Sequence, residues 1–254
     1  MLTPRGKLTT IYSFCKSDCT DGAKPQQLLE ATDGNLYGTT FDGGFGGSDG
    51  GGTIFRITPS GAFSVLYSFC SQSECTDGWQ PQSLIQGSDG NLYGVTYQGG
   101  GAGDCLGTLG CGTVFELTLD GVLTTLYVFQ PTNSFFPTGL TQGTDGKFYG
   151  AAGGGTVNAN CQYGCGTIFR LDTGLGPFVS FVLPAGRANR NTEIIGQGFT
   201  GTTAVSLNGI PASFTVKSDT FIEATVPAGA TTGYVAVTTP SGTLTSNVPF
   251  QVIP

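Results

Sequence analysis

A six-residue motif recurs along this chain at a constant spacing. Asp33-Gly-Asn-Leu-Tyr-Gly38 reappears as Asp89-Gly-Asn-Leu-Tyr-Gly94 and, with two substitutions, as Asp145-Gly-Lys-Phe-Tyr-Gly150. The three aspartates are 56 residues apart, and the motifs Gly-Thr-Ile/Val-Phe and Tyr-x-Phe recur in the same order between them. A period of this length is typical of a repeat architecture with one supersecondary unit per period.

One full unit extends from about residue 81 to residue 129, and its pattern predicts four strands. Asp89-Gly90 and Asp120-Gly121 are hairpin signals, because glycine accepts the positive φ that a tight turn requires. Leu123, Tyr127 and Phe129 alternate with polar residues at period two, as expected for a half-buried strand. A repeated four-stranded antiparallel meander is typical of a β-propeller blade. Residues 1–14, 25–69, 81–129 and 137–183 therefore predict about three and a half blades, fewer than a closed propeller has.

The sequence changes character near residue 183. Residues 1–183 hold 7 Lys/Arg and 14 Asp/Glu, whereas residues 184–254 hold three of each. From Pro184 on, strands of five or six residues rich in Val, Thr, Ile and Phe alternate with turn residues, which predicts a small β-sandwich. We therefore expect an all-β chain with two domains, a propeller-like array over 1–183 and a sandwich over 184–254.

Eight cysteines occur in four close pairs, and each pair is present or absent as a unit in equivalent loops. Paired gain and loss is what local disulfides predict, and disulfides indicate an oxidising compartment. Zinc held by four thiolates is the alternative, but the two kinds of pair lie at different points of the unit. The expected disulfides are Cys15–Cys19, Cys70–Cys75, Cys105–Cys111 and Cys161–Cys165.

Two segments resemble known families. Leu-Tyr-Gly-x-Thr, the Gly-Gly loop and Gly-Thr-Val-Phe make residues 1–183 similar to the bacterial tandem repeats called GloVer. Residues 184–254 resemble an IPT/TIG domain, an immunoglobulin-like module, through Gly196-x-Gly-Phe199, Val205-Ser-Leu-Asn-Gly209 and Val235-x-Val-Thr-Thr-Pro-Ser-Gly242. Such proteins are surface-anchored or secreted, and neither resemblance implies a catalytic residue or a cofactor.

The composition narrows the classes of function. The chain has no histidine, which excludes a Ser-His-Asp triad and a histidine metal ligand. A net charge of −7 without a basic patch argues against nucleic acid as a partner. No apolar run is long enough for a transmembrane helix, and no signal peptide is visible. Because Leu2–Phe14 aligns with Ile57–Phe69, the chain begins inside a repeat, and we expect it to be a piece of a longer secreted protein.

Candidate binding residues are few. The Asp-Gly turns at 33, 89, 120 and 145 could ligate calcium, although an aspartate at a turn usually bonds its own backbone. Trp79 is the only tryptophan and replaces Ala23 of the first repeat, so it is a candidate for stacking on a sugar ring or for packing within its loop.

The sequence leaves three function classes open. The first is a non-enzymatic extracellular or cell-surface protein for adhesion, matrix or surface-polymer binding, with a polysaccharide or a protein as partner. The second is a carbohydrate-active propeller enzyme, a lyase or glycosidase. The third is a structural subunit that self-associates through open blade edges. We expect the first, without catalytic activity, with Gln98–Gly112 and Cys70–Pro81 as contact rims and Trp79 as ligand residue.

Overall fold

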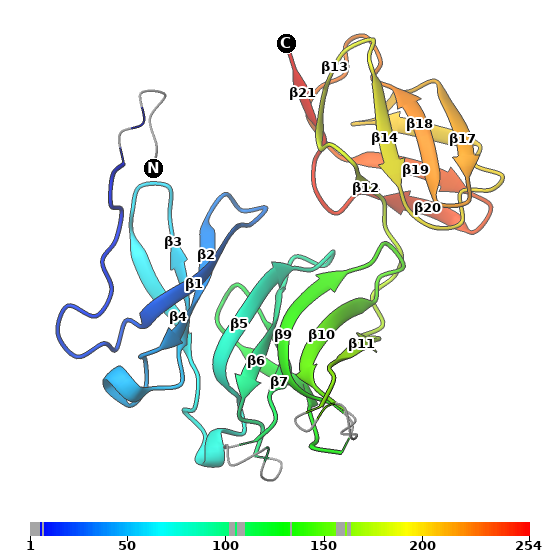
Figure 1. Cartoon of the computed structure of the whole chain (residues 1–254). Helices are drawn as coiled ribbons and strands as arrows, with labels where there is room; N and C mark the ends of the chain where they lie inside the picture. The colour runs from blue at the N-terminus through cyan, green and yellow to red at the C-terminus, as the bar shows by residue number, and fades with distance from the viewer. Residues whose placement is uncertain are drawn as a thin grey trace. The chain divides into compact units, whose positions relative to one another are not determined.

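A computed structural model of the chain describes residue 6 and residues 8–101, 105, 110–132, 134–155, 161 and 164–254. Over these residues the chain is all-β, as expected (Figure 1). The strands are β1 (Ala23–Glu30), β2 (Leu36–Asp42), β3 (Thr53–Ile57), β4 (Phe63–Ser68), β5 (Trp79–Gln86), β6 (Leu92–Gln98), β7 (Thr113–Leu117), β8 (Leu123–Val128), β9 (Phe135–Gln142), β10 (Phe148–Gly154), β11 (Thr167–Leu171), β12 (Ser180–Phe181), β13 (Ala185–Arg187), β14 (Asn191–Ile195), β15 (Ala204–Leu207), β16 (Ile210–Pro211), β17 (Phe214–Ser218), β18 (Phe221–Thr225), β19 (Val235–Thr239), β20 (Gly242–Thr245) and β21 (Gln251–Ile253). Two short 3-10 turns are η1 (Gly47–Asp49) and η2 (Ser73–Cys75).

The chain divides into two compact units. The first contains Met1–Thr141 and Tyr149–Arg170, and the second contains Gln142–Phe148 and Leu171–Pro254. The predicted domain boundary at residue 183 is not tested by this division and stays a prediction.

The predicted meanders are present. Sheet I has the order β1-β2-β3-β4, sheet II has the order β5-β6-β7-β8, and sheet III has the order β11-β10-β9. Neighbouring strands in sheets I and II are antiparallel, in chain order (Figure 1). The four strands expected in the second repeat are thus confirmed, and the first of them begins earlier than predicted, at Trp79.

The recurring Asp-Gly-Asn-Leu-Tyr motif builds the turn between the first two strands of a sheet. The Asp33 carboxylate accepts hydrogen bonds from the Asn35 backbone N–H, the Asn35 side-chain amide and the Tyr37 hydroxyl. Asp89 accepts the same three bonds from Asn91 and Tyr93. The motif therefore recurs because the turn requires it.

The glycine that ends this motif accommodates the ring of a phenylalanine. Gly94 lies opposite Phe115 in the sheet II ladder, and a Cβ on Gly94 would lie 2.4 Å from Phe115 Cζ. The same conflict would arise at 2.4 Å between Gly38 and Phe55, and at 2.2 Å between a Cβ on Gly150 and Phe169. A ring laid over a cross-strand glycine fills the space that the missing side chain leaves.

Each of these rings also contacts a phenylalanine from the preceding repeat, and two of those phenylalanines, Phe69 and Phe129, directly follow the last strand of their sheet. The ring centroids are 5.0 Å apart for Phe14–Phe55, 5.1 Å for Phe69–Phe115 and 5.0 Å for Phe129–Phe169. Sheets I and II share one apolar core in this way. Its buried residues are Ala31, Tyr37, Ile54, Phe69, Leu84, Leu92, Phe115 and Leu117.

Two segments do not form the fourth strand of a repeat sheet. Residues 8–14, expected to contain the fourth strand of an incomplete repeat, contain one β-bridge residue, Leu8, and no strand. Residues 174–181, which lie within the expected third repeat (residues 137–183), do not join sheet III. Phe178 instead donates its backbone N–H to Thr144 O, and Ser180–Phe181 pairs with β14. Their apolar residues Val179 and Phe181 are buried in the core of the second unit, which explains the difference.

The second unit contains two four-stranded sheets, with the orders β12-β14-β18-β17 and β16-β15-β19-β20. Ile194 and Ile222 of one sheet and Val205 and Val237 of the other are at most 2% exposed and belong to one apolar cluster. Strands β13 and β21 form a separate parallel pair. The alternation of apolar and polar residues thus gives two sheets that share one core, as the pattern predicted.

The glycine beneath each phenylalanine gives a direct test of this packing. Gly94→Ala should lower the free energy of unfolding by about 1–3 kcal/mol, because the added methyl collides with Phe115 and with the Ser83 carbonyl. Gly139→Ala is the control, since Gly139 also lies in a strand but a Cβ there would have no atom within 4 Å. We expect that control to be stabilised by about 0.5–1 kcal/mol. Equal midpoints for the two variants in denaturant titrations would contradict the packing described.

Candidate binding site

All four predicted disulfides are present. Cys15 bonds to Cys19, Cys70 to Cys75, Cys105 to Cys111, and Cys161 to Cys165. No cysteine among the described residues is free, which favours the disulfides over the zinc alternative for these eight cysteines. The first two disulfides close equivalent loops, residues 15–22 and 70–78, which we call the cysteine loops.

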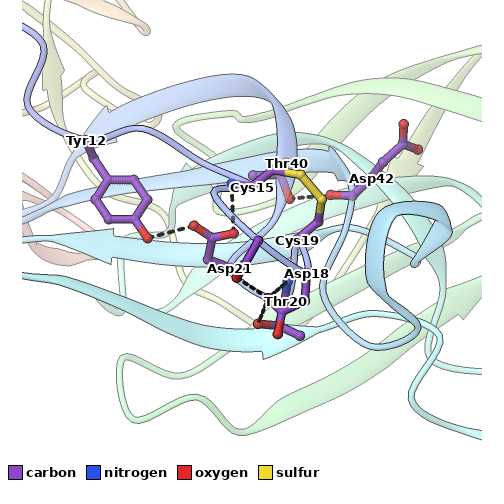
Figure 2. Close-up of a disulfide and its surroundings, with 9 residues drawn as sticks. Tyr12, Cys15, Asp18, Cys19, Thr20, Asp21, Thr40 and Asp42 are labelled. Carbon is purple, nitrogen blue, oxygen red and sulfur yellow. Dashed lines mark hydrogen bonds between the residues drawn. A yellow bond between two sulfur atoms is a disulfide. The ribbon is translucent and has the colours of Figure 1, made fainter.

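An aspartate that the sequence analysis did not single out anchors each cysteine loop. Asp21 accepts hydrogen bonds from the Tyr12 hydroxyl at 2.7 Å and from the Cys15 backbone N–H at 2.9 Å (Figure 2). In the next repeat, Asp77 accepts bonds from the Tyr67 hydroxyl at 2.9 Å and from the Ser71 backbone N–H at 3.1 Å. The identical spacing of Asp21 and Asp77, 56 residues, was the signal that could have identified this role.

Asp77 is the more enclosed of the two anchors. It is 1% exposed, and its Oδ2 also accepts a hydrogen bond from the Ser71 hydroxyl, whereas its Oδ1 is buried and has no hydrogen-bond partner among the described residues. Burial first, and then the bond to Asp77, raises the pKa of Tyr67. The tyrosine therefore stays protonated and donates to the carboxylate at neutral pH.

A glycine-rich loop of the same sheet is hydrogen-bonded to each cysteine loop. Gly44 donates its backbone N–H to Cys19 O at 2.9 Å, and Gly100 donates to Cys75 O at 2.8 Å. In the second pair the approach is close enough that a Cβ on Gly99 would lie 2.5 Å from the Gly78 backbone. The two predicted contact rims, Cys70–Pro81 and Gln98–Gly112, are therefore adjacent where the structure describes them. Residues 102–104 and 106–109 of the second rim lie outside the described residues.

Trp79 lies at this rim, although not in a loop. It is the first residue of β5, pairs with Gln98 of β6 and is half-buried. Its indole N–H is buried and has no hydrogen-bond partner within the described structure. The equivalent residues of the other repeats are Ala23 and Phe135, so only the second repeat presents an indole here. Its role as a ligand residue stays a prediction.

Three of the Asp-Gly turns considered for calcium, those at Asp33, Asp89 and Asp145, use their carboxylates locally. Burial alone raises the pKa of Asp33, but the hydrogen bonds from Asn35 and Tyr37 hold that pKa below its ordinary value. Asp145 accepts a bond from the Lys147 backbone N–H. In the parts of the chain that the structure describes, no three acidic or cysteine side chains converge as a metal site would require. Calcium binding by this chain stays untested.

Sequence comparison decides the family. Residues 1–216 match the Gloeobacter/Verrucomicrobia repeat. The chain belongs to this repeat family. The match covers the three repeats and continues beyond residue 183, the expected end of the repeat array. No curated protein matches the chain.

Solved structures similar to this member of the Gloeobacter/Verrucomicrobia repeat family are distant from it. A structure described as a gluconolactonase is 19% identical, with 88% of this chain and 64% of that one covered and a TM-score of 0.39. A fungal alcohol oxidase is 15% identical, with 92% of this chain and 55% of that one covered and a TM-score of 0.43. A streptogramin B lyase is 17% identical, with 86% of this chain and 63% of that one covered and a TM-score of 0.35. The chain spans less than two thirds of each of these structures.

These comparisons correct one expectation. The sequence analysis predicted a protein without catalytic activity, whereas the similar solved structures are described as enzymes. The prediction of a non-enzyme is therefore withdrawn. At these identities and TM-scores, the similarity brings none of their substrates or reactions to this chain.

The cysteine loops predict a measurable contribution to stability. Replacing Cys70 and Cys75 together by serine should lower the free energy of unfolding by about 2 kcal/mol, because the short closed loop no longer restricts the unfolded chain. Peptide mapping of the unreduced protein should recover the four local pairs and no free thiol. Crossed pairs or bound zinc with free thiols would contradict the assignment.

The Tyr12–Asp21 contact predicts that the stability of the fold decreases at alkaline pH. Burial, followed by the hydrogen bond to Asp21, raises the pKa of Tyr12 to about 12. Because the folded-state value is raised, this contact stabilises the fold below the unfolded tyrosine pKa of about 10, and the contribution is lost as the pH rises toward about 12. Tyr12→Phe should therefore flatten the decrease in melting temperature between those two pH values. An unchanged slope would show that the contact contributes nothing.

Proposed function

We propose that this chain is an extracellular or cell-surface protein whose cysteine-loop rims bind a surface polymer, most simply a polysaccharide. One observation carries the proposal: sheets I and II hold the same rim, built from a cysteine loop and a hydrogen-bonded glycine-rich loop. Similar contact surfaces repeated along one chain favour a ligand that itself repeats, because several weak contacts then add as avidity. Adhesion or matrix binding is the cellular role that fits such a surface.

The compartment and the finer fold assignments belong to the same proposal. Four disulfides support a location outside the cytoplasm, where such bonds persist. No helix among the described residues has the length and apolar character to cross a membrane. We interpret sheets I–III as propeller blades, and residues 184–254, with their two sheets about one core, as an IPT/TIG immunoglobulin-like domain.

Trp79 is the residue to monitor. It is the only tryptophan in the chain, so its fluorescence reports on the rim of the second repeat alone. An aromatic face stacks on the apolar face of a sugar ring, and tryptophan offers the largest such face. We therefore titrate the whole chain with bacterial and plant polysaccharides while recording tryptophan fluorescence.

The proposal predicts a saturable fluorescence change with at least one polysaccharide. Trp79→Ala should weaken binding about tenfold in a pull-down with that polymer, whereas Trp79→Phe should retain most of it. No change across the panel, together with unaltered pull-down by Trp79→Ala, would contradict the polysaccharide proposal and direct attention to a protein partner. The same samples are assayed for new reducing ends, which would instead indicate the carbohydrate-active enzyme.

A further inference from the structure

Successive sheets of the repeat array meet along two equivalent seams. In the first seam, between sheets I and II, Gln80 of β5 donates its backbone N–H to Gly51 O at 2.7 Å. In the second seam, between sheets II and III, Phe136 of β9 donates its backbone N–H to Cys111 O at 2.9 Å. Gln80 and Phe136 are 56 residues apart and have similar positive φ angles, 59° and 57°. The second seam therefore repeats the backbone arrangement of the first.

A glutamine side chain joins the two sheets of the first seam. The Gln27 carboxamide of β1 donates a hydrogen bond to Leu84 O of β5 and accepts one from the Leu84 backbone N–H, both at 2.9 Å. These two backbone groups of Leu84 therefore point out of sheet II toward sheet I. A carboxamide suits this position because it carries a donor beside an acceptor.

The second seam has a serine where the first has this glutamine. Ser83 occupies the position of Gln27, and Leu140 occupies that of Leu84, each 56 residues later in the chain. Ser83 is only 8% exposed, and its hydroxyl is buried without a hydrogen-bond partner among the described residues. Because buried hydroxyls in native proteins are nearly always hydrogen-bonded, this one marks the seam as a place for a bound group.

The backbone of β9 keeps Leu140 directed toward this seam. The carbonyl oxygens of Gln27, Ser83 and Gly139 each lie against the glycine opposite, where a Cβ would collide with them, so the three strands follow the same course here. The N–H and C=O of Leu140, the next residue of β9, therefore face sheet II as those of Leu84 face sheet I. A Cβ on Gly139 would have no atom within 4 Å, which shows open space beside these groups.

An aromatic pair lies at the second seam. The rings of Tyr97 in β6 and Phe136 in β9 are stacked, with centroids 4.6 Å apart and planes 18° apart, and both residues are half-buried. The first seam has Phe41 and Gln80 at these positions, so it has one ring instead of two. Aromatic faces favour the apolar face of a sugar ring.

We propose that the second seam, at Ser83 and Leu140, binds a saccharide whose adjacent hydroxyls take the place of the Gln27 carboxamide. One sugar hydroxyl accepts from the Leu140 backbone N–H, the other donates to Leu140 O, and the Ser83 hydroxyl bonds to the same pair. Adjacent hydroxyls, like a carboxamide, offer a donor beside an acceptor. This inference rests on the proposed polysaccharide function and places a sugar unit in the second seam, since Gln27 fills the first.

Hydrogen exchange at two leucine amides tests the seam before any ligand is added. In the whole chain with isotope-labelled leucine, the Leu140 amide should exchange about tenfold faster than the Leu84 amide, because Leu84 donates to a side-chain carboxamide and Leu140 has none at this position. Ser83→Gln should slow the exchange at Leu140, and Gln27→Ser should speed it at Leu84. Equal exchange at the two amides of the parent chain, or no response to either substitution, overturns the proposed geometry.

Titration of the same labelled chain with cellotriose, laminaritriose and mannotriose tests the ligand. At least one of these probes should shift the Leu140 amide resonance saturably and leave the Leu84 resonance in place. Ser83→Gln should abolish the shift, because the added carboxamide occupies the seam. Ser83→Ala keeps the seam open and should bind the probe about tenfold more weakly, since one hydrogen bond is lost.

The outcomes separate this site from the proposed function itself. If polysaccharides change Trp79 fluorescence but no probe shifts Leu140, or if Ser83→Gln binds the probe as the parent chain does, the seam site is overturned and the polysaccharide function stands. If neither signal responds to any saccharide, both are overturned. A shift at Leu140 that Ser83→Gln removes and Trp79→Ala leaves unchanged supports the seam and contradicts Trp79 as a ligand residue.

Discussion

The contact on which the repeat array depends is a phenylalanine ring laid over a glycine and covered by a second phenylalanine from the preceding repeat. In sheet II, Phe115 crosses Gly94 and contacts Phe69, which follows the last strand of sheet I. Because the ring lies across its own sheet, it leaves a surface against which the neighbouring sheet packs. Its three occurrences explain why Leu-Tyr-Gly and Gly-Thr-Ile/Val-Phe recur together.

The repeat, the strands and the disulfides could be predicted from the sequence because each depends on residues close in the chain. Asp89 accepts hydrogen bonds from Asn91 and Tyr93, so the residues that stabilise the turn all lie within the motif itself. The sheet that residues 174–181 join could not be predicted in this way. A fourth strand beside β11 and a first strand beside β14 need the same alternation of apolar residues, and burial of Val179 and Phe181 in the second unit decides between them.

The candidate site was predicted only in outline. The loops Cys70–Pro81 and Gln98–Gly112 were chosen as rims, and they are adjacent where described. The buried carboxylate of Asp77 was missed, because an aspartate before glycine is common in turns and its long-range partner Tyr67 is not visible in the local pattern. Trp79 was expected in a loop but begins β5, since its ladder partner Gln98 lies in a later strand.

The central claim is that successive sheets are held by the paired phenylalanines, and a double-mutant cycle tests it most directly. Phe69→Leu, Phe115→Leu and the double variant are compared with the parent chain by denaturant unfolding. If the two rings interact as described, the cycle gives a coupling energy of about 0.5–1.5 kcal/mol beyond the cost of burial. Strictly additive effects of the two substitutions would contradict the account.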